Sequence, residues 1–135
     1  MDHHDDRAAL ALMQLQDTLA GHYAGLSRHK MRLMVKLEHG PLSVSELAER
    51  LHISSPAVSQ MIDKLATEGY VRRDSLGDDL RMVGVSLTDS GRLALAAALD
   101  AFRQRVNAIL SPLDVEEKRT FVELITKISE ATNHE

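Results

Sequence analysis

Hydrophobic residues near the N-terminus recur at helical spacing, so they form one stripe along a helix. The residues of this stripe are Leu12, Leu15, Leu19 and Leu26. The pattern predicts a helix from about Arg7 to Leu26, in which Gly21 and Gly25 weaken the last turns. A second helix is expected to begin after an N-cap at Ser27 and to end at His39-Gly40-Pro41.

The middle of the chain has the pattern of two short amphipathic helices joined by a tight turn. Ser43 and Glu46 have the spacing of a capping box, which predicts the start of the first helix. The second helix is expected over residues 55–68, with Ser55 as its N-cap and a left-handed stop at Gly69.

The second of these helices has one apolar face and one polar face. The apolar residues are Val58, Met61, Ile62 and Leu65. The polar face comprises Pro56, Gln60, Asp63 and Thr67, flanked by Ser59 and Lys64. Any surface helix can have such a pattern, so the helix alone is only weak support for DNA contact.

Two strand-like runs follow the second helix. Tyr70–Arg73 and Met82–Leu87 contain strand-forming residues, and the polar segment Asp74–Leu80 between them is rich in turn-forming residues. The order helix, turn, helix and β-hairpin is typical of a winged helix-turn-helix. We therefore expect binding to double-stranded DNA through the helix at 55–68 and a wing at 74–81.

Arg81 lies at the root of the predicted wing loop. An arginine there is expected to enter a minor groove, where a narrow A·T-rich groove strengthens the negative potential. Asp79 can hold this guanidinium through a charge-assisted hydrogen bond. The alternative is a solvent-exposed pair with no role in binding.

The C-terminal part predicts two further helices. Thr88 is expected to cap a long helix whose apolar residues have the 3.5-residue spacing of helices packed side by side, namely Leu95, Leu99, Phe102, Val106 and Ile109. Ser111-Pro112 ends it, and the capping-box pair Asp114 and Glu117 starts the last helix. The apolar face of the last helix contains Phe121, Val122, Leu124, Ile125 and Ile128. An intrachain core is one interpretation, but a hairpin of two helices has little to pack on, so we expect exchange with a second subunit.

These patterns together predict a mainly α-helical fold with a small β-hairpin wing. We expect an N-terminal dimerisation helix within residues 1–30, a winged helix-turn-helix domain at 31–88 and a C-terminal helical hairpin for dimerisation at 89–135. The fold class is thus a winged helix-turn-helix domain with a helical dimerisation region.

The composition fits this interpretation. Apolar residues make up 44% of the 135 residues but aromatic residues only 3%, which favours a helical core of aliphatic side chains. There is no cysteine, which excludes disulfides, thiolate metal sites and cysteine redox switches. The sequence contains no apolar run of ~20 residues and no signal-peptide pattern, so we expect a cytoplasmic protein without a membrane partner.

The net charge of −4 is the main compositional argument against nucleic-acid binding. The acidic residues are dense at both ends of the chain, but the predicted DNA-binding region is not basic either. From residue 54 to 87 its cations are Lys64, Arg72, Arg73 and Arg81, and its anions are Asp63, Glu68, Asp74, Asp78 and Asp79. We therefore expect a few well-placed cations, two cooperating copies and weak non-specific binding.

The whole chain resembles the MarR family of bacterial winged-helix transcriptional regulators. The residues that carry the resemblance are Leu47-Ala48-Glu49-Arg50-Leu51, the helix from Ser54 to Leu65, Glu68-Gly69-Tyr70-Val71-Arg72-Arg73, Asp79-Leu80-Arg81 and Leu87-Thr88-Asp89-Ser90-Gly91. The resemblance implies a homodimer with interlocked terminal helices, in which two recognition helices enter successive major grooves of a pseudo-palindrome and Arg81 reaches the minor groove. It also implies ligand-controlled repression.

The chain departs from this family at one position of the recognition helix. Family members often carry arginine where this chain has Gln60, which can instead pair its amide with adenine. Ser55 and Ser59 are then expected to contact phosphates or base edges. The full set of candidate DNA-binding residues is Ser54, Ser55, Ser59, Gln60, Lys64, Arg73, Asp79 and Arg81.

A candidate effector site is implied by the same resemblance. Small aromatic or phenolic ligands in this family often bind between the dimer helices and the winged domain. The corresponding residues here are His22, Tyr23, Arg28, His29, Met31 and Met34. The competing interpretation makes the methionines core residues, Tyr23 an interface residue and the histidines surface residues.

Neither a metal nor another cofactor is expected. The chain has seven histidines, yet no pair of them has i, i+4 spacing on a predicted helix. No glycine-rich phosphate loop and no Ser-His-Asp arrangement is present, so an enzyme is improbable. A dimeric transcription factor is the leading prediction, and a winged-helix protein-interaction module without sequence-specific DNA binding is the alternative.

Overall fold

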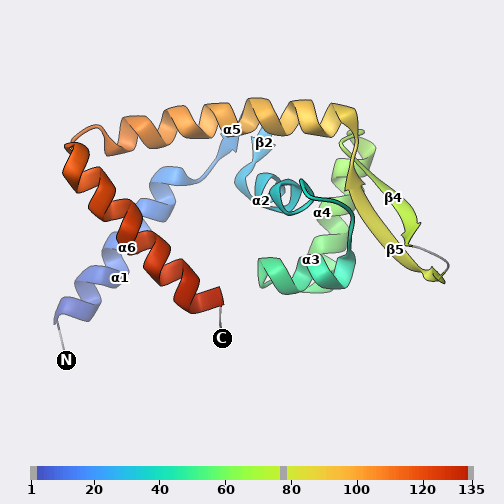
Figure 1. Cartoon of the computed structure of the whole chain (residues 1–135), viewed down its shortest axis with the longest axis horizontal. Coiled ribbons are helices and arrows are strands. Elements are labelled where there is room, and N and C mark those ends of the chain that lie inside the picture. The colour runs from blue at the N-terminus through green and yellow to red at the C-terminus, as the bar shows by residue number, and fades with distance from the viewer. Residues whose placement is uncertain (1–2, 77–78, 134–135) are drawn as a thin grey trace. The chain divides into compact units, whose positions relative to one another are not determined.

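The structure is a computed structural model that describes residues 3–76 and 79–133, with side chains described for 6–74 and 83–132. The helices are α1 His3–Leu19, α2 Arg28–Lys36, α3 Val44–Leu51, α4 Ser55–Thr67, α5 Asp89–Leu110 and α6 Val115–Asn133 (Figure 1). The strands are β1 His22–Tyr23, β2 Leu26–Ser27, β3 Leu42–Ser43, β4 Val71–Leu76 and β5 Asp79–Leu87. The predicted mainly helical fold with a β-hairpin wing is confirmed. The chain forms two compact units, Met1–Phe102 and Arg103–Glu135.

The core of the first unit lies where α2, α3 and α4 pack against one another and against the sheet. Its fully buried side chains are almost all aliphatic: Leu26, Leu33, Met34, Leu37, Leu47, Val58, Ile62, Leu65 and Val85. Each such side chain contributes about 1.5–3 kcal/mol relative to an exposed position. The core therefore fixes α4 from one side and leaves its opposite face to solvent.

The N-terminal helix is shorter than its hydrophobic pattern suggests. It ends at Leu19, and β1 and β2 then pair as a short antiparallel hairpin. The two turn residues, Ala24 and Gly25, have φ values of 49° and 86°, as a type I′ turn requires. The prediction of one helix up to Leu26 was wrong, because two consecutive left-handed residues cannot continue a right-handed helix.

The helix-turn-helix is formed by α3 and α4. The predicted capping box is confirmed: the Glu46 N–H donates to Ser43 Oγ at 3.1 Å, and the Ser43 N–H donates to Glu46 Oε1 at 3.2 Å. His52 ends α3 with a left-handed φ of 57°. The Ile53 N–H then donates to the Ala48 carbonyl at 3.1 Å, so a local backbone hydrogen bond closes the start of the turn.

The recognition helix α4 has a defined cap at each end. Ser54, and not Ser55 as predicted, is its N-cap, since Ser54 Oγ accepts a 3.2 Å hydrogen bond from the Ala57 N–H. At the other end Gly69 has a φ of 82°, and the Tyr70 N–H donates to the Leu65 carbonyl at 2.9 Å. This is a Schellman motif, so the predicted glycine stop is confirmed.

The sheet has the strand order β3-β5-β4 and is antiparallel throughout. Leu42 pairs with Val85, so the segment before α3 joins the later hairpin. The predicted polar loop over 74–80 was too long, because β4 continues to Leu76 and β5 begins at Asp79. A polar sequence is compatible with these strand ends because strands pair through backbone hydrogen bonds. The hairpin also extends away from α3 and α4 (Figure 1).

The sheet is joined to α5 at Thr88. Its hydroxyl donates to the Gly69 carbonyl at 2.6 Å and accepts from the Gly91 N–H at 3.0 Å, and its own N–H donates to the Tyr70 carbonyl at 3.1 Å. Thr88 is thus the N-cap of α5, as predicted. A Cβ atom on Gly91 would lie only 2.0 Å from the Tyr70 carbonyl oxygen, so only glycine fits there.

The second unit contains the end of α5 and all of α6. The capping box before α6 is confirmed, because the Glu117 N–H donates to Asp114 Oδ1 at 2.8 Å and the Asp114 N–H donates to Glu117 Oε1 at 3.0 Å.

Within the described parts of the chain, no helix is long and apolar enough to cross a bilayer.

Candidate nucleic-acid interface

The exposed face of α4 carries most of the predicted DNA-binding residues. Ser54, Ser55, Gln60 and Lys64 are exposed, and Ser59 is half-buried. The Ser54 hydroxyl oxygen accepts the capping hydrogen bond, which leaves its hydrogen free to donate. The helix thus presents several hydrogen-bond donors, one amide and one cation on a surface that α2 and α3 do not cover.

The predicted wing residues lie partly outside the described region. The backbones of Asp79 and Arg81 belong to β5, but their side chains are outside the described residues. The proposed ion pair between them stays a prediction.

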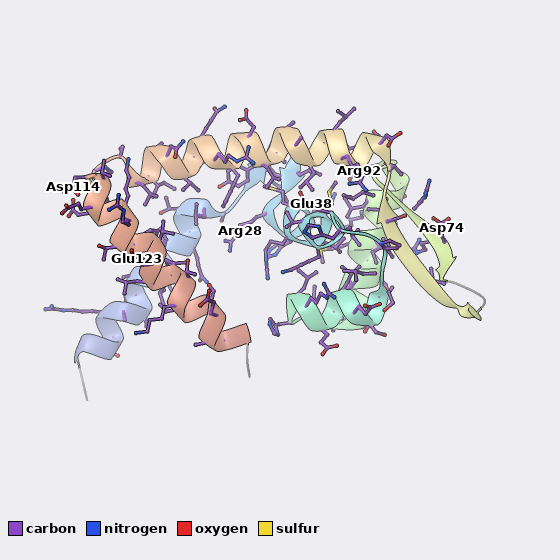
Figure 2. The ribbon with its side chains drawn as sticks, in the orientation of Figure 1. Arg28, Glu38, Asp74, Arg92, Asp114 and Glu123 are labelled. Carbon is purple, nitrogen blue, oxygen red and sulfur yellow. The ribbon has the colours of Figure 1, made fainter. Side chains whose placement is uncertain are left out.

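Arg73 is on β4 and contacts the recognition helix. Its guanidinium forms an ion pair with the Asp63 carboxylate, and both side chains are well exposed. The neighbouring Arg72 forms an exposed ion pair at 2.9 Å with Asp74, which is labelled beside β4 in Figure 2. Sequence analysis placed these charges in one region but did not show which of them pair, because the pairing between α4 and β4 depends on the tertiary fold.

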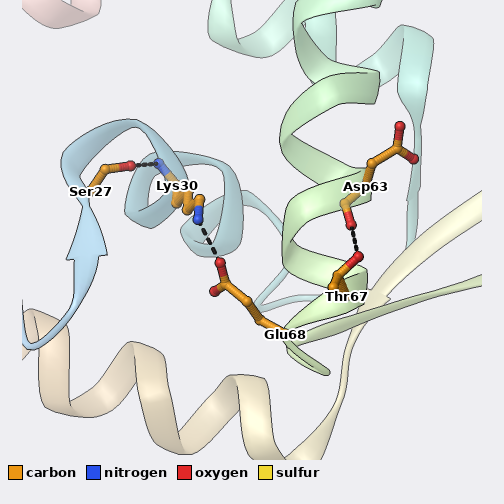
Figure 3. A network of polar contacts seen from close by, with 5 residues as sticks. All are labelled: Ser27, Lys30, Asp63, Thr67 and Glu68. Carbon is orange, nitrogen blue, oxygen red and sulfur yellow. Dashed lines mark hydrogen bonds and ion pairs between the residues drawn. The ribbon is translucent and has the colours of Figure 1, made fainter.

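A third ion pair connects α2 to the end of α4. Lys30 Nζ lies 2.7 Å from Glu68 Oε1, and the Ser27 hydroxyl accepts from the Lys30 N–H at 3.2 Å (Figure 3). On α4 itself, the Thr67 hydroxyl donates to the Asp63 carbonyl at 2.9 Å (Figure 3). Sequence reasoning missed the link to Glu68, whose partner is far away along the chain.

A hollow of about 400 Å³ lies beside the exposed face of α4. Its lining residues are Ser27, His29, Lys30, Ile53, Ala57, Gln60, Met61 and Lys64. Four of these side chains carry nitrogen (His29, Lys30, Gln60 and Lys64) and none is acidic, so this part of the surface is less acidic than the net charge of the chain implies.

The candidate effector residues are not gathered in one place. Arg28 and Met31 line a pocket of about 200 Å³, while Met34 is fully buried in the core. His29 lines the separate hollow beside α4, and His22 is exposed. Tyr23 packs edge-on against Phe102, and its hydroxyl donates to the Leu19 carbonyl at 2.6 Å.

The pocket beside α2 is formed mainly by residues that the sequence analysis did not select. Besides Arg28 and Met31, its lining comprises Arg32, Val35, Lys36, Leu99 and Phe102. Arg28, Arg32 and Lys36 follow one another at i, i+4 spacing on α2, so they lie along one side of that helix. This spacing is the sequence signal that could have identified them. The pocket has an apolar wall and a cationic edge.

Among the side chains that the structure describes, no group of three His, Cys, Asp or Glu residues is arranged to hold a metal ion. The side chains of the tail residues His3 and His4 lie outside the described range.

The apolar face of α6 is uncovered in the single chain. Its exposed residues include Val122, Leu124, Ile125 and Ile128. On α1, Leu10, Leu12 and Met13 are also largely exposed. Such contiguous apolar surface on helices is typical of an interface with another chain.

Several solved structures share this fold. A probable transcriptional regulator from Pseudomonas aeruginosa superposes with a TM-score of 0.80 at 28% identity, over 92% of this chain and 98% of that one. A mutant of Escherichia coli MarR, crystallised with operator DNA, has a TM-score of 0.75 at 21% identity and is covered over 91% in both chains. At that identity the second likeness concerns the fold alone.

Sequence comparisons lead to the same family. The model of the MarR family matches residues 26–83. The HTH-type transcriptional regulator TcaR of Staphylococcus aureus (strain Newman) is 31% identical over 132 residues, which cover 93% of this chain and 86% of TcaR. Several other curated relatives are matched over 61–70% of their own lengths. The family match and the nearly complete alignment with TcaR show that this chain belongs to the MarR family of transcriptional regulators.

Proposed function

We propose that this protein is a dimeric repressor that binds a pseudo-palindromic operator through the recognition helix and the wing of each subunit. The exposed polar face of α4, held by a buried apolar face and capped at both ends, is the observation that carries the proposal. A mutant of E. coli MarR, which shares this fold, has been crystallised with operator DNA, and this supports DNA binding by the fold.

The proposed dimer follows from the apolar surface of the terminal helices. Val122, Leu124, Ile125 and Ile128 are between 38% and 62% exposed in the single chain. Burial of this surface against a second copy removes apolar area from water, at roughly 25 cal/mol for each Å². Two copies also bring two recognition helices to one operator, which compensates for the weakly cationic surface of each.

The proposed roles at the DNA follow from side-chain chemistry. Gln60 offers a donor and an acceptor on one amide, which suits the N6 and N7 atoms of adenine. Lys64, Ser54, Ser55 and Ser59 suit phosphates, because their hydrogens can be donated to anionic oxygens. We assign Arg81 to the minor groove and Arg73 to the phosphates beside the wing.

We expect Gln60→Ala to relax sequence preference at one base pair of each half-site, with a loss of about 1–3 kcal/mol in discrimination. Arg81→Ala should instead lower the affinity for all sequences and reduce the salt slope by about 1. Selection of bound duplexes from a random pool, followed by anisotropy titrations of both variants, measures the two effects. Unchanged binding curves for both variants would contradict the assignments.

The proposal of sequence-specific binding has a direct test. A duplex from the selected pool should bind at low salt and be released as salt rises, because released counterions drive part of the affinity. A protein-interaction module without DNA specificity, which the net charge of −4 favours, would give no enriched sequence.

We propose that an aromatic or phenolic anion controls DNA binding from the pocket beside α2. The pocket volume of about 200 Å³ suits one substituted ring, which Met31, Val35, Leu99 and Phe102 can contact. Arg28, Arg32 and Lys36 at its edge can pair with a carboxylate or phenolate. Repression follows if the operator overlaps a promoter, and the anion then acts as the inducer.

We expect Val35→Trp to fill this pocket and to reduce ligand-induced release of the operator at least tenfold. Its affinity for the operator should stay within about twofold of the wild type, because Val35 does not line the hollow beside the exposed face of α4. The measurement is release of a labelled operator by a panel of benzoic and hydroxybenzoic acids. Leu93→Trp is the matched control, since Leu93 is 75% exposed on α5 and does not line the pocket. Equal release from both variants would place the effector elsewhere.

A further inference from the structure

The acidic residue Asp63 lies in the middle of the exposed face of the recognition helix. Gln60 precedes it by almost one turn, Thr67 follows it by about one turn, and its side chain is 68% exposed. Its carboxylate forms the ion pair with Arg73 of β4, while its carbonyl accepts from the Thr67 hydroxyl (Figure 3). A carboxylate on a surface that meets phosphates is unfavourable by itself, so its position requires an explanation.

The pairing of Asp63 removes a cation from the DNA-facing surface. Arg73 would otherwise offer its guanidinium donors to any phosphate near the wing, regardless of sequence. Arg72 and Asp74 form a similar pair on the same strand. Successive residues of a strand point to opposite faces, so this second pair lies on the face of the hairpin away from α4. Among the side chains that the structure describes, the ion pair of Asp63 is the one that joins the wing to the recognition helix.

We propose that Asp63 is a specificity-determining residue: it holds Arg73 and so suppresses binding to DNA of random sequence. This inference rests on the proposed function. At a random site, phosphate binding by Arg73 must displace the carboxylate and bring phosphate close to Asp63, with no compensating base contact. At the operator, base contacts from Gln60 and the neighbouring residues fix the helix in the groove, and the exposed ion pair is then weak enough to exchange for phosphate.

The decisive variant is Asp63→Asn, which keeps the size of the side chain and removes its charge. We expect it to bind a random duplex about three to ten times more tightly at low salt than the wild type, because one more phosphate is contacted. The salt slope on random duplex should steepen by about 0.9, as one added phosphate contact predicts. Affinity for the selected operator should change less, so the ratio of operator to random affinity should fall.

Two controls separate this mechanism from a general effect of charge. Asp74→Asn removes the same charge from the other face of the hairpin, and we expect it to change random-duplex affinity less than twofold. In an Arg73→Ala background, Asp63→Asn should lose most of its effect, since there is no longer a guanidinium to release. Circular dichroism confirms that each variant is folded before titration.

The inference is overturned by any of three results: Asp63→Asn binds random duplex no more tightly than the wild type, Asp74→Asn gives an equal gain, or the gain persists without Arg73. Failure of the proposed function has a different signature, because the wild type would then show no enriched sequence and no difference between operator and random duplex.

Discussion

Gly91→Ala should destabilise the protein by about 3 kcal/mol or more, with a fall of more than about 10 °C in its unfolding midpoint. A methyl group at this position would lie 2.0 Å from the Tyr70 carbonyl oxygen and 2.9 Å from the Tyr70 carbonyl carbon. Both atoms belong to the backbone, which is fixed by the hydrogen bond from the Thr88 N–H. The clash cannot be relieved by rotation of a side chain, so the first turn of α5 must move away from the sheet.

The sign of this effect distinguishes packing from helix propensity. Alanine is favoured over glycine inside a helix by about 1 kcal/mol, so propensity alone predicts that Gly91→Ala stabilises α5. Gly69→Ala is the matched control. Gly69 has open space around it but a left-handed φ of 82°, so the variant should lose only about 1–2 kcal/mol.

Thermal unfolding of both variants, followed by circular dichroism at 222 nm, measures the two effects. A midpoint for Gly91→Ala at or above that of Gly69→Ala would show that α5 and Tyr70 do not approach as closely as described.

The double variant Ile125→Lys/Ile128→Lys should be monomeric at micromolar concentration and should lose about 100-fold or more in operator affinity. Both isoleucines are on the uncovered apolar face of α6, where two ammonium groups would have to be desolvated in the proposed dimer. A monomer engages one half-site at a time, so the gain of about 10²–10⁴ from joint binding disappears. Light scattering gives the oligomeric state, and anisotropy titration gives the affinity.

The matched control is Glu123→Lys/Glu130→Lys, which also introduces two lysines. Both positions are exposed and lie on the side of α6 opposite its apolar residues, at about 100° of rotation for each residue. We expect this variant to stay dimeric and to bind DNA at least as tightly, because it is more cationic. A dimeric Ile125→Lys/Ile128→Lys variant would show that this face of α6 does not hold the subunits together.

Most of the fold could be predicted because its elements carry local signals. The capping boxes at Ser43 and Asp114, the glycine stop at Gly69 and the threonine cap at Thr88 each use residues within a few positions. Such signals determine where a helix begins or ends through contacts with the neighbouring backbone, so they can be recognised without knowledge of the tertiary fold.

The misplaced elements lacked such a signal. The hairpin after α1 depends on left-handed conformations at both Ala24 and Gly25, and alanine gives no indication of a positive φ. The cap of α4 was misplaced by one residue because Ser54 and Ser55 are chemically alike. The wing strands were underestimated because the polar sequence after Arg73 is also typical of a loop.

The candidate site was only partly accessible to sequence reasoning. The exposed face of α4 follows from helical periodicity, so the exposure of Gln60 and Lys64 could be predicted. The pairing of Asp63 with Arg73 and the meeting of α2 with Leu99 depend on contacts between elements far apart in the chain. No periodicity within one helix carries that information.

The joint at Thr88 has a mechanical consequence for the first unit. Two hydrogen bonds from Thr88 to the Gly69 and Tyr70 carbonyls, and the close approach of Gly91 to Tyr70, join the first turn of α5 to the base of the hairpin. A tilt of that turn must therefore move the hairpin as well. Leu99 and Phe102, which border the pocket beside α2, are further along the same uninterrupted helix. In the proposed effector complex, a ring bound against Leu99 and Phe102 would therefore displace α5 and, through Thr88, the wing.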